Sequence, residues 1–167
     1  MLQTFDQRNR DLLVNINGKL IHRDHAGISP FDSAVQGGDA VWEGLRLYNG
    51  RIFRLKEHLD RLRHSAMALA FTDIPSRETI TAEIRKTLSA NGMKDGVHIR
   101  LTLTRGVKVT SGMDPRLNQS GPTLIVLAEH KAPVYSTDGI TLVTSSVRRF
   151  PPDCLDPKIH HCNLIQS

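Results

Sequence analysis

Alternation of apolar and polar residues predicts the strands of this chain, because such a pattern buries one face of a strand. The clearest example is 97–105, where every second residue is apolar. Residues 123–128 form a continuous apolar run, which is typical of a buried strand. A further strand is expected to begin at Gly139 and to run to Val147.

Two β-hairpins are predicted in the first third of the chain. One spans residues 12–23 and the other residues 41–54, and each has Asn-Gly at its centre. Asn-Gly suits a type I′ turn, because both central residues of that turn need a positive φ.

Helical spacing of apolar residues predicts two helices after the second hairpin. In the first, residues 55–71, the buried stripe is expected to contain Leu55, Leu59, Leu62, Ala66 and Leu69. The second helix is expected to begin after Ser76, a suitable N-cap, and to end near Gly92, which fits the left-handed cap position.

The order of these elements indicates an α+β fold rather than a regular βαβ series. Residues 22–39 are rich in turn formers and are expected to be irregular. Residues 106–122 form a long loop, and such loops are often binding loops or lids. The predicted organisation is a small α+β domain over 1–130, a linker over 131–138 and the start of another domain over 139–167.

Composition narrows the class of protein. The chain has 167 residues, of which 39% are hydrophobic and 23% charged, as in ordinary globular proteins. No apolar stretch is long enough for a membrane helix, and we see no secretory signal at the N-terminus. The net charge of +5 is spread without a basic block, which argues against a nucleic-acid partner. The two cysteines favour a reduced, cytoplasmic setting.

Several common site motifs are absent from the sequence. There is no GxxxxGK[ST] or GxGxxG phosphate loop, no HExxH and no GxSxG. The group Cys154, His160, His161 and Cys162 contains metal-ligand types, but its spacing matches none of the usual zinc patterns. We therefore expect no metal.

Four segments together resemble the fold-type IV pyridoxal-phosphate enzymes, which include branched-chain and D-amino-acid aminotransferases and aminodeoxychorismate lyases. The segments are VNINGKLI, QGGDAVWEGLRLYNGRIFRLKEHLDRLRHSA, GVHIRLTLTRG and VTSSVRRFPPDCLDPKIHHCNL. They cover most of the chain in the order of the family. The segment from Val41 to Ser65, with the combination of WEGLRLY, EHLDRL and then SA, is the most specific.

The resemblance implies pyridoxal 5'-phosphate as cofactor and assigns two residues to it. Arg61, in EHLDRL, matches the arginine that binds the cofactor phosphate, and a guanidinium fork suits a dianion. Lys158, in LDPKIHH, matches the lysine that carries the cofactor covalently and moves the substrate proton. Such an amine should lie in a desolvating or cationic site.

The resemblance also implies substrate-binding residues. Arg100 matches an arginine of the branched-chain enzymes that handles the substrate carboxylate, whereas Arg105, in TRG, resembles the pattern of the D-amino-acid enzymes. Gly38 and Glu43 lie where the family builds the substrate pocket and the surroundings of the cofactor. The chain departs from the branched-chain pattern at Asn163, where those enzymes usually have a tyrosine.

Family subunits are roughly twice as long, so the chain is expected to be the N-terminal half of an aminotransferase followed by the beginning of the large domain. The missing half is expected to supply the acid that pairs with the pyridine nitrogen. The expected reaction is transamination of branched-chain or related amino acids with 2-oxoglutarate, in a homodimer. The alternatives are a D-amino-acid aminotransferase, an aminodeoxychorismate lyase type of enzyme, and an inactive truncated dimerisation or scaffold domain.

Overall fold

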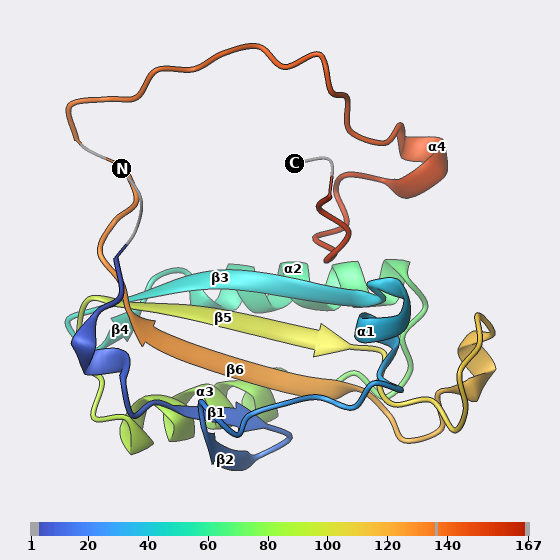
Figure 1. The fold of residues 1–167 in the computed structure, drawn as a ribbon, viewed down its shortest axis with the longest axis horizontal. Helices are drawn as coiled ribbons and strands as arrows, with labels where there is room; N and C mark the ends of the chain where they lie inside the picture. The colour runs from blue at the N-terminus through green and yellow to red at the C-terminus, as the bar shows by residue number, and fades with distance from the viewer. Residues whose placement is uncertain (1–3, 136, 166–167) are drawn as a thin grey trace.

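The computed structural model describes residues 4–135 and 137–165, and in these residues a single sheet of six strands forms the centre of the fold (Figure 1). The strands lie in the order β2-β1-β6-β5-β3-β4, and all neighbours run antiparallel. Their bounds are β1 Leu13–Ile16, β2 Lys19–His22, β3 Ala40–Tyr48, β4 Arg51–Ile52, β5 Val97–Thr104 and β6 Thr123–His130.

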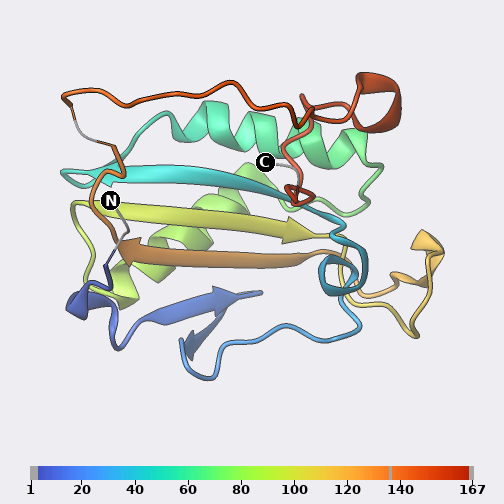
Figure 2. The same ribbon diagram turned by 45° about the horizontal axis from the view of Figure 1, so that its top comes forward.

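Two long helices, α2 (Leu55–Ala68) and α3 (Arg77–Ala90), lie against one face of the sheet (Figures 1 and 2). Ser76 is the N-cap of α3, and its hydroxyl accepts a hydrogen bond from the backbone N–H of Thr79 at 3.1 Å. Gly92 has a φ of 62° just after α3 ends. The remaining short elements are α1 Ser33–Gly37, α4 Pro152–Leu155 and the 3₁₀ turns η1 Gln7–Asn9 and η2 Pro115–Leu117.

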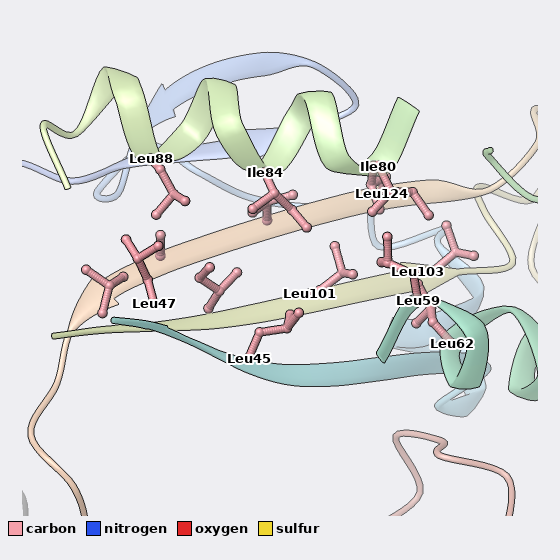
Figure 3. Packing of buried hydrophobic residues seen from close by; sticks show 14 of the residues in the cluster. Leu45, Leu47, Leu59, Leu62, Ile80, Ile84, Leu88, Leu101, Leu103 and Leu124 are labelled. Carbon is pink, nitrogen blue, oxygen red and sulfur yellow. The ribbon is translucent and has the colours of Figure 1, made fainter. Parts of the chain in front are cut away.

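The core fills the space between these helices and the sheet. Figure 3 shows Ile80, Ile84 and Leu88 of α3 pointing toward the face of the sheet that carries Leu45 and Leu101. Each of these five side chains is buried. Full burial of such a side chain contributes about 1.5–3 kcal/mol to folding, so this layer holds the strands and helices in fixed positions.

The α+β fold class predicted from the sequence is confirmed, and so are most of its elements. The strands expected over 97–105 and 123–128 are β5 and β6, and both hairpins form. Asn17 and Gly18 have φ values of 49° and 80°, as a type I′ turn requires.

Two expectations about single segments are wrong. Residues 139–147 are all exposed and form no strand, because none of the described residues provides a ladder for them. Residues 22–39, expected to be irregular, contain helix α1. Its N-cap Asp32 accepts hydrogen bonds from the hydroxyls of Thr104 and Thr123, so distant residues hold it in place.

The C-terminal segment leaves the end of β6, crosses the molecule and returns to the start of β3 (Figures 1 and 2). There the backbone N–H of Trp42 donates to the His160 carbonyl at 3.0 Å, and that of Cys162 donates to the Ala40 carbonyl at 2.9 Å. The segment thus extends the sheet beside a part of β3 that β4 does not reach. The domain division at 131–138 stays a prediction.

Candidate active site

The site is built around a buried acid, Glu43, on the face of β3 that packs against α2. Alternation along β3 places Glu43 between two fully buried residues, Val41 and Leu45. Its carboxylate accepts hydrogen bonds from Nε and Nη2 of Arg61 at 2.7 and 2.6 Å. Nδ1 of His58, three residues earlier on α2, lies 2.7 Å from the same carboxylate. Spacing of one helical turn therefore brings both side chains to one acid.

These contacts determine the charge of Glu43. Burial disfavours its ionised form, but the hydrogen bonds with Arg61 and His58 and the nearby His160 ring outweigh burial and lower the pKa of Glu43 to about 2. The hydrogen bond to Glu43 in turn raises the pKa of Arg61. Glu43 and Arg61 therefore form an ion pair at neutral pH.

The segment that carries Lys158 is held beside α2 by its neighbours in sequence. The backbone N–H of His160 donates to Oγ of Ser65 on α2 at 3.0 Å. The His160 ring stacks on Trp42, with 4.1 Å between ring centroids, and Nε1 of Trp42 donates to the His161 carbonyl at 3.0 Å. These contacts join the start of β3, α2 and the residues just after Lys158.

Arg61 and Lys158, assigned to one cofactor by resemblance, line the same cavity, whose volume is about 480 Å³. This volume lies within the range of small-molecule sites. The other residues that line it are Glu57, Asp60, His64, Ser65, Ala68, Asp156 and Ile159. Two chain segments far apart in sequence thus contribute a guanidinium and a primary amine to one space.

The donors in this cavity fit a phosphorylated aldehyde. Glu43 occupies Nε and Nη2 of Arg61, whereas Nη1 has no hydrogen bond from the described residues and can bind a phosphate. The Lys158 amine makes no ion pair within the described part of the chain. Lys158 is exposed, so the described residues do not desolvate it, and its cavity contains Arg61 together with the carboxylates of Glu57, Asp60 and Asp156.

Arg100 lies on the opposite face of the sheet from Glu43, next to Trp42. Its guanidinium carbon is 3.5 Å from the centroid of the Trp42 ring, which is a cation–π contact. Burial lowers the pKa of Arg100. Burial also raises the pKa of the Cys162 thiol, and the neighbouring Arg100 only partly offsets this. Trp42 thus links Arg100 to the segment that follows Lys158.

Arg105 has a different environment. Its Nε and Nη2 donate to the carboxylate of Asp39 at 2.6 and 3.3 Å. Nη2 and Nη1 also donate to the carbonyls of Leu69 and Ala70, and the guanidinium lies over the Phe71 ring. All three guanidinium nitrogens of Arg105 are therefore engaged, and they connect the end of α2 to Asp39, the residue before β3. Arg105 does not line the cavity of Arg61 and Lys158.

Gly38 closes helix α1 in the left-handed conformation, with φ 66° and ψ 18°. Its carbonyl accepts a hydrogen bond from the side-chain amide of Asn163 at 3.1 Å. A Cβ at this position would lie only 2.5 Å from Oδ1 of Asn163. Gly38 therefore contacts the C-terminal segment, but it does not line the cavity.

The contacts of His58, His160 and Trp42 at the site were not predicted from the sequence, and neither was the pairing of Glu43 with Arg61. One signal was available for Glu43. The alternation of β3 places it on the same face as apolar residues, and a buried carboxylate needs a cationic partner. The approach of His160 to Trp42 depends on the return of the chain, and no local pattern indicates it.

Features typical of membrane-spanning and metal-binding proteins are not found among the described residues, 4–135 and 137–165. No helix among them is both long and apolar enough to cross a membrane. Within the same residues, no group of three or more histidine, cysteine, aspartate or glutamate side chains is arranged to hold a metal ion.

Comparison with known proteins places this geometry in a family. The family described as Amino-transferase class IV matches residues 40–167. The chain is 58% identical to branched-chain-amino-acid aminotransferase-like protein 2 of Arabidopsis thaliana over 160 residues, which are 95% of this chain and 29% of that protein. It is 41% identical to a putative branched-chain-amino-acid aminotransferase of Methanocaldococcus jannaschii, over 92% of this chain and 52% of that protein.

A solved structure is also similar to this fold. It is a T.th. branched-chain amino acid aminotransferase complexed with N-(5'-phosphopyridoxyl)-L-glutamate, with a TM-score of 0.77 and 28% identity. The alignment covers 91% of this chain and 50% of that one. The chain thus spans at most about half the length of these similar proteins. Sequence and fold agree, and the chain belongs to the class IV aminotransferase family.

Proposed function

We propose that the chain forms the Arg61 and Lys158 part of a pyridoxal-phosphate-dependent aminotransferase that acts on branched-chain or related amino acids. The acceptor proposed for the amino group is 2-oxoglutarate. The main support is that Arg61 and Lys158 line one cavity of about 480 Å³. The similar T.th. enzyme was solved with a phosphopyridoxyl derivative of glutamate, which is consistent with both cofactor and acceptor.

Each residue has a defined task in this proposal. Pyridoxal phosphate supplies an aldehyde and a conjugated ring that withdraws electrons from the substrate Cα. Arg61 binds the phosphate through the guanidinium edge that Glu43 leaves open. Lys158 would hold the cofactor through its amine, and the same amine, once free, would hold or move the proton at the substrate Cα.

Arg100 is the proposed ligand of the substrate carboxylate. The three nitrogens of Arg105 are engaged by Asp39, Leu69 and Ala70, which argues against Arg105 in this role. Arg100 is instead held against Trp42 by a cation–π contact. The branched-chain type of enzyme, whose arginine Arg100 matches, is the type proposed, and Arg100, like Arg105, lies outside the cavity of Arg61 and Lys158.

Residues outside this chain complete the proposed enzyme, since the chain spans at most about half the length of its relatives. These residues are proposed to supply the acid that faces the pyridine nitrogen. A homodimer and a cytoplasmic location are further parts of the proposal.

The test is covalent capture of the cofactor by Lys158. The chain is incubated with pyridoxal phosphate, reduced with borohydride and digested, and mass spectrometry locates the modified lysine. Lys158 is expected to be the main site, and Lys158→Ala should abolish the absorbance change on binding. Lys94→Ala, at an exposed lysine outside the cavity, is the matched control and should leave the signal unchanged.

Two results would contradict the proposal. Equal labelling of many lysines, with no loss in Lys158→Ala, would show non-specific condensation, and a folded dimer without bound cofactor would favour a scaffold role.

Product analysis then tests the reaction type. A 2-oxo acid together with a new amino acid supports transamination, whereas release of pyruvate by elimination supports a lyase.

A further inference from the structure

Glu43 is an ionised group in an apolar environment. It is fully buried on the helix-facing side of β3, where the neighbouring residues on the same face are Val41 and Leu45. Burial of an unpaired carboxylate is strongly unfavourable, so a buried acid indicates partners that need its charge. The partner with the best geometry is Arg61.

The contact with Glu43 fixes the orientation of the Arg61 guanidinium. Two parallel hydrogen bonds, Nε to Oε1 at 2.7 Å and Nη2 to Oε2 at 2.6 Å, keep the guanidinium and carboxylate groups in one plane. The Arg61 side chain is 52% exposed, and a side chain of this length otherwise samples several rotamers. With Nε and Nη2 held, the Nη1 side of the fork is the part left to other ligands.

One histidine is hydrogen-bonded to the Glu43 carboxylate, and a second lies close to it. Nδ1 of His58 lies 2.7 Å from Oε2, and Nδ1 of His160 lies 3.4 Å from Oε1. His160 follows Lys158 by two residues, and its backbone is bonded to Ser65 of α2. The acid therefore contacts both segments that line the cavity, through Arg61 on one side and His160 on the other.

We infer that Glu43 is a positioning residue for the cofactor phosphate: it holds the guanidinium of Arg61 so that the Nη1 side faces the cavity. The inference rests on the function proposed above. It goes further because it makes the affinity for the phosphate depend on Glu43, which acts through Arg61 and not by contact with cofactor or substrate. A negative charge near a phosphate site would by itself weaken binding, so only its effect on Arg61 can make Glu43 favourable.

The test compares pyridoxal phosphate with pyridoxal, which lacks the phosphate. Dissociation constants of both are measured for the full 167-residue chain and for Glu43→Gln. A glutamine amide presents an N–H toward Arg61, so the two-bond contact is lost. We expect the dissociation constant of pyridoxal phosphate to rise about tenfold, which is about 1.4 kcal/mol, and that of pyridoxal to stay within about twofold.

Three further variants separate positioning from other effects. Glu57→Gln removes a carboxylate from the wall of the same cavity that is bonded to Arg54 rather than to Arg61, and it should not weaken binding of pyridoxal phosphate. Arg61→Ala should abolish the preference for the phosphorylated ligand, and adding Glu43→Gln to it should change nothing more. Glu43→Asp keeps the negative charge, and it should give a smaller loss of affinity that again affects pyridoxal phosphate and not pyridoxal. If Glu43→Gln does not fold, Glu43→Asp takes its place in the test.

The outcomes distinguish the two proposals. If the unmodified chain does not bind pyridoxal phosphate at Lys158, both the function and the role of Glu43 are wrong. If it binds, but Glu43→Gln weakens both ligands equally, Glu43 has only a structural role and the function stands. A phosphate-selective loss in Glu43→Gln and Glu43→Asp, absent from Glu57→Gln, supports the inference.

Discussion

The two ends of the candidate site are held by the fold in different ways. Arg61 belongs to the region 4–130, which contains every buried residue of the hydrophobic core. Lys158 belongs to the C-terminal segment, where His161 is the one buried residue among those the structure describes after residue 131. Packing therefore fixes the helix that carries Arg61, whereas a few hydrogen bonds, one ring stack and the partly buried Ile159 hold the segment that carries Lys158.

The two residues of the candidate site thus lie in parts of the fold that differ in how many buried contacts hold them. Figure 2 shows the C-terminal segment running outside the layer formed by α2 and the sheet before it returns to β3. The guanidinium of Arg61 is set by Glu43 without any help from the Lys158 side chain.

The same substitution placed in each region gives the largest expected contrast. Leu101→Ala, at a side chain with 0% exposure, should lower the free energy of unfolding by about 2–5 kcal/mol, because it leaves a cavity in the core. Leu142→Ala, at 81% exposure, should change it by no more than about 0.5 kcal/mol. Urea titration followed by circular dichroism measures both, and equal effects would mean that the C-terminal segment has a core of its own.

Acid should selectively weaken the part of the fold that holds Arg61. The folded-state pKa of Glu43, about 2, is below its ordinary value of 4.5. Its contribution, about 3 kcal/mol, is therefore complete above pH 4.5 and is lost as the pH falls toward 2. The stability of Glu43→Gln should depend less on pH in this window than that of the unmodified chain. Parallel curves for the two proteins would show that Glu43 is not the group responsible.

The smallest expected effect concerns the docking of the C-terminal segment. Gly38→Ala and Gly50→Ala both place a side chain at a positive φ, which costs about 1 kcal/mol. Only Gly38→Ala adds a clash with Asn163, since a Cβ at Gly50 meets nothing within 4 Å. The Cys162 amide, which is bonded to Ala40, should exchange its hydrogen faster in Gly38→Ala than in Gly50→Ala. Equal exchange rates in the two variants would show that Gly38 does not contribute to the docking of the C-terminal segment.

Local signals were sufficient to predict most of the fold. The Asn-Gly turns, the Ser76 cap and the apolar stripe of α2 each depend on neighbours in sequence, and all three are confirmed. Helix α1 was missed because its N-cap Asp32 is secured by hydroxyls from β5 and β6. The strand over 139–147 was wrong because alternation alone does not supply a pairing partner.

Most of the candidate site was predictable only where a motif named its residues. Arg61 and Lys158 came from the resemblance, and they line one cavity, although their roles stay predictions. The role of Arg105 implied by its TRG motif is not supported by its surroundings, because a motif does not show that Asp39 and the end of α2 already use its donors. The stack of His160 on Trp42 requires the chain to fold back, which no short pattern encodes.

The hydrogen bonds that His160 and Cys162 make with the start of β3 have a consequence for solubility. An uncovered strand edge is a template on which another molecule can add a strand, and this is a common origin of aggregation. The returning segment shields that edge, yet it is connected to β6 by an exposed stretch that proteases can reach. A cut in that stretch would leave the returning segment held to β3 by noncovalent contacts alone, and loss of the segment would expose the edge to another molecule.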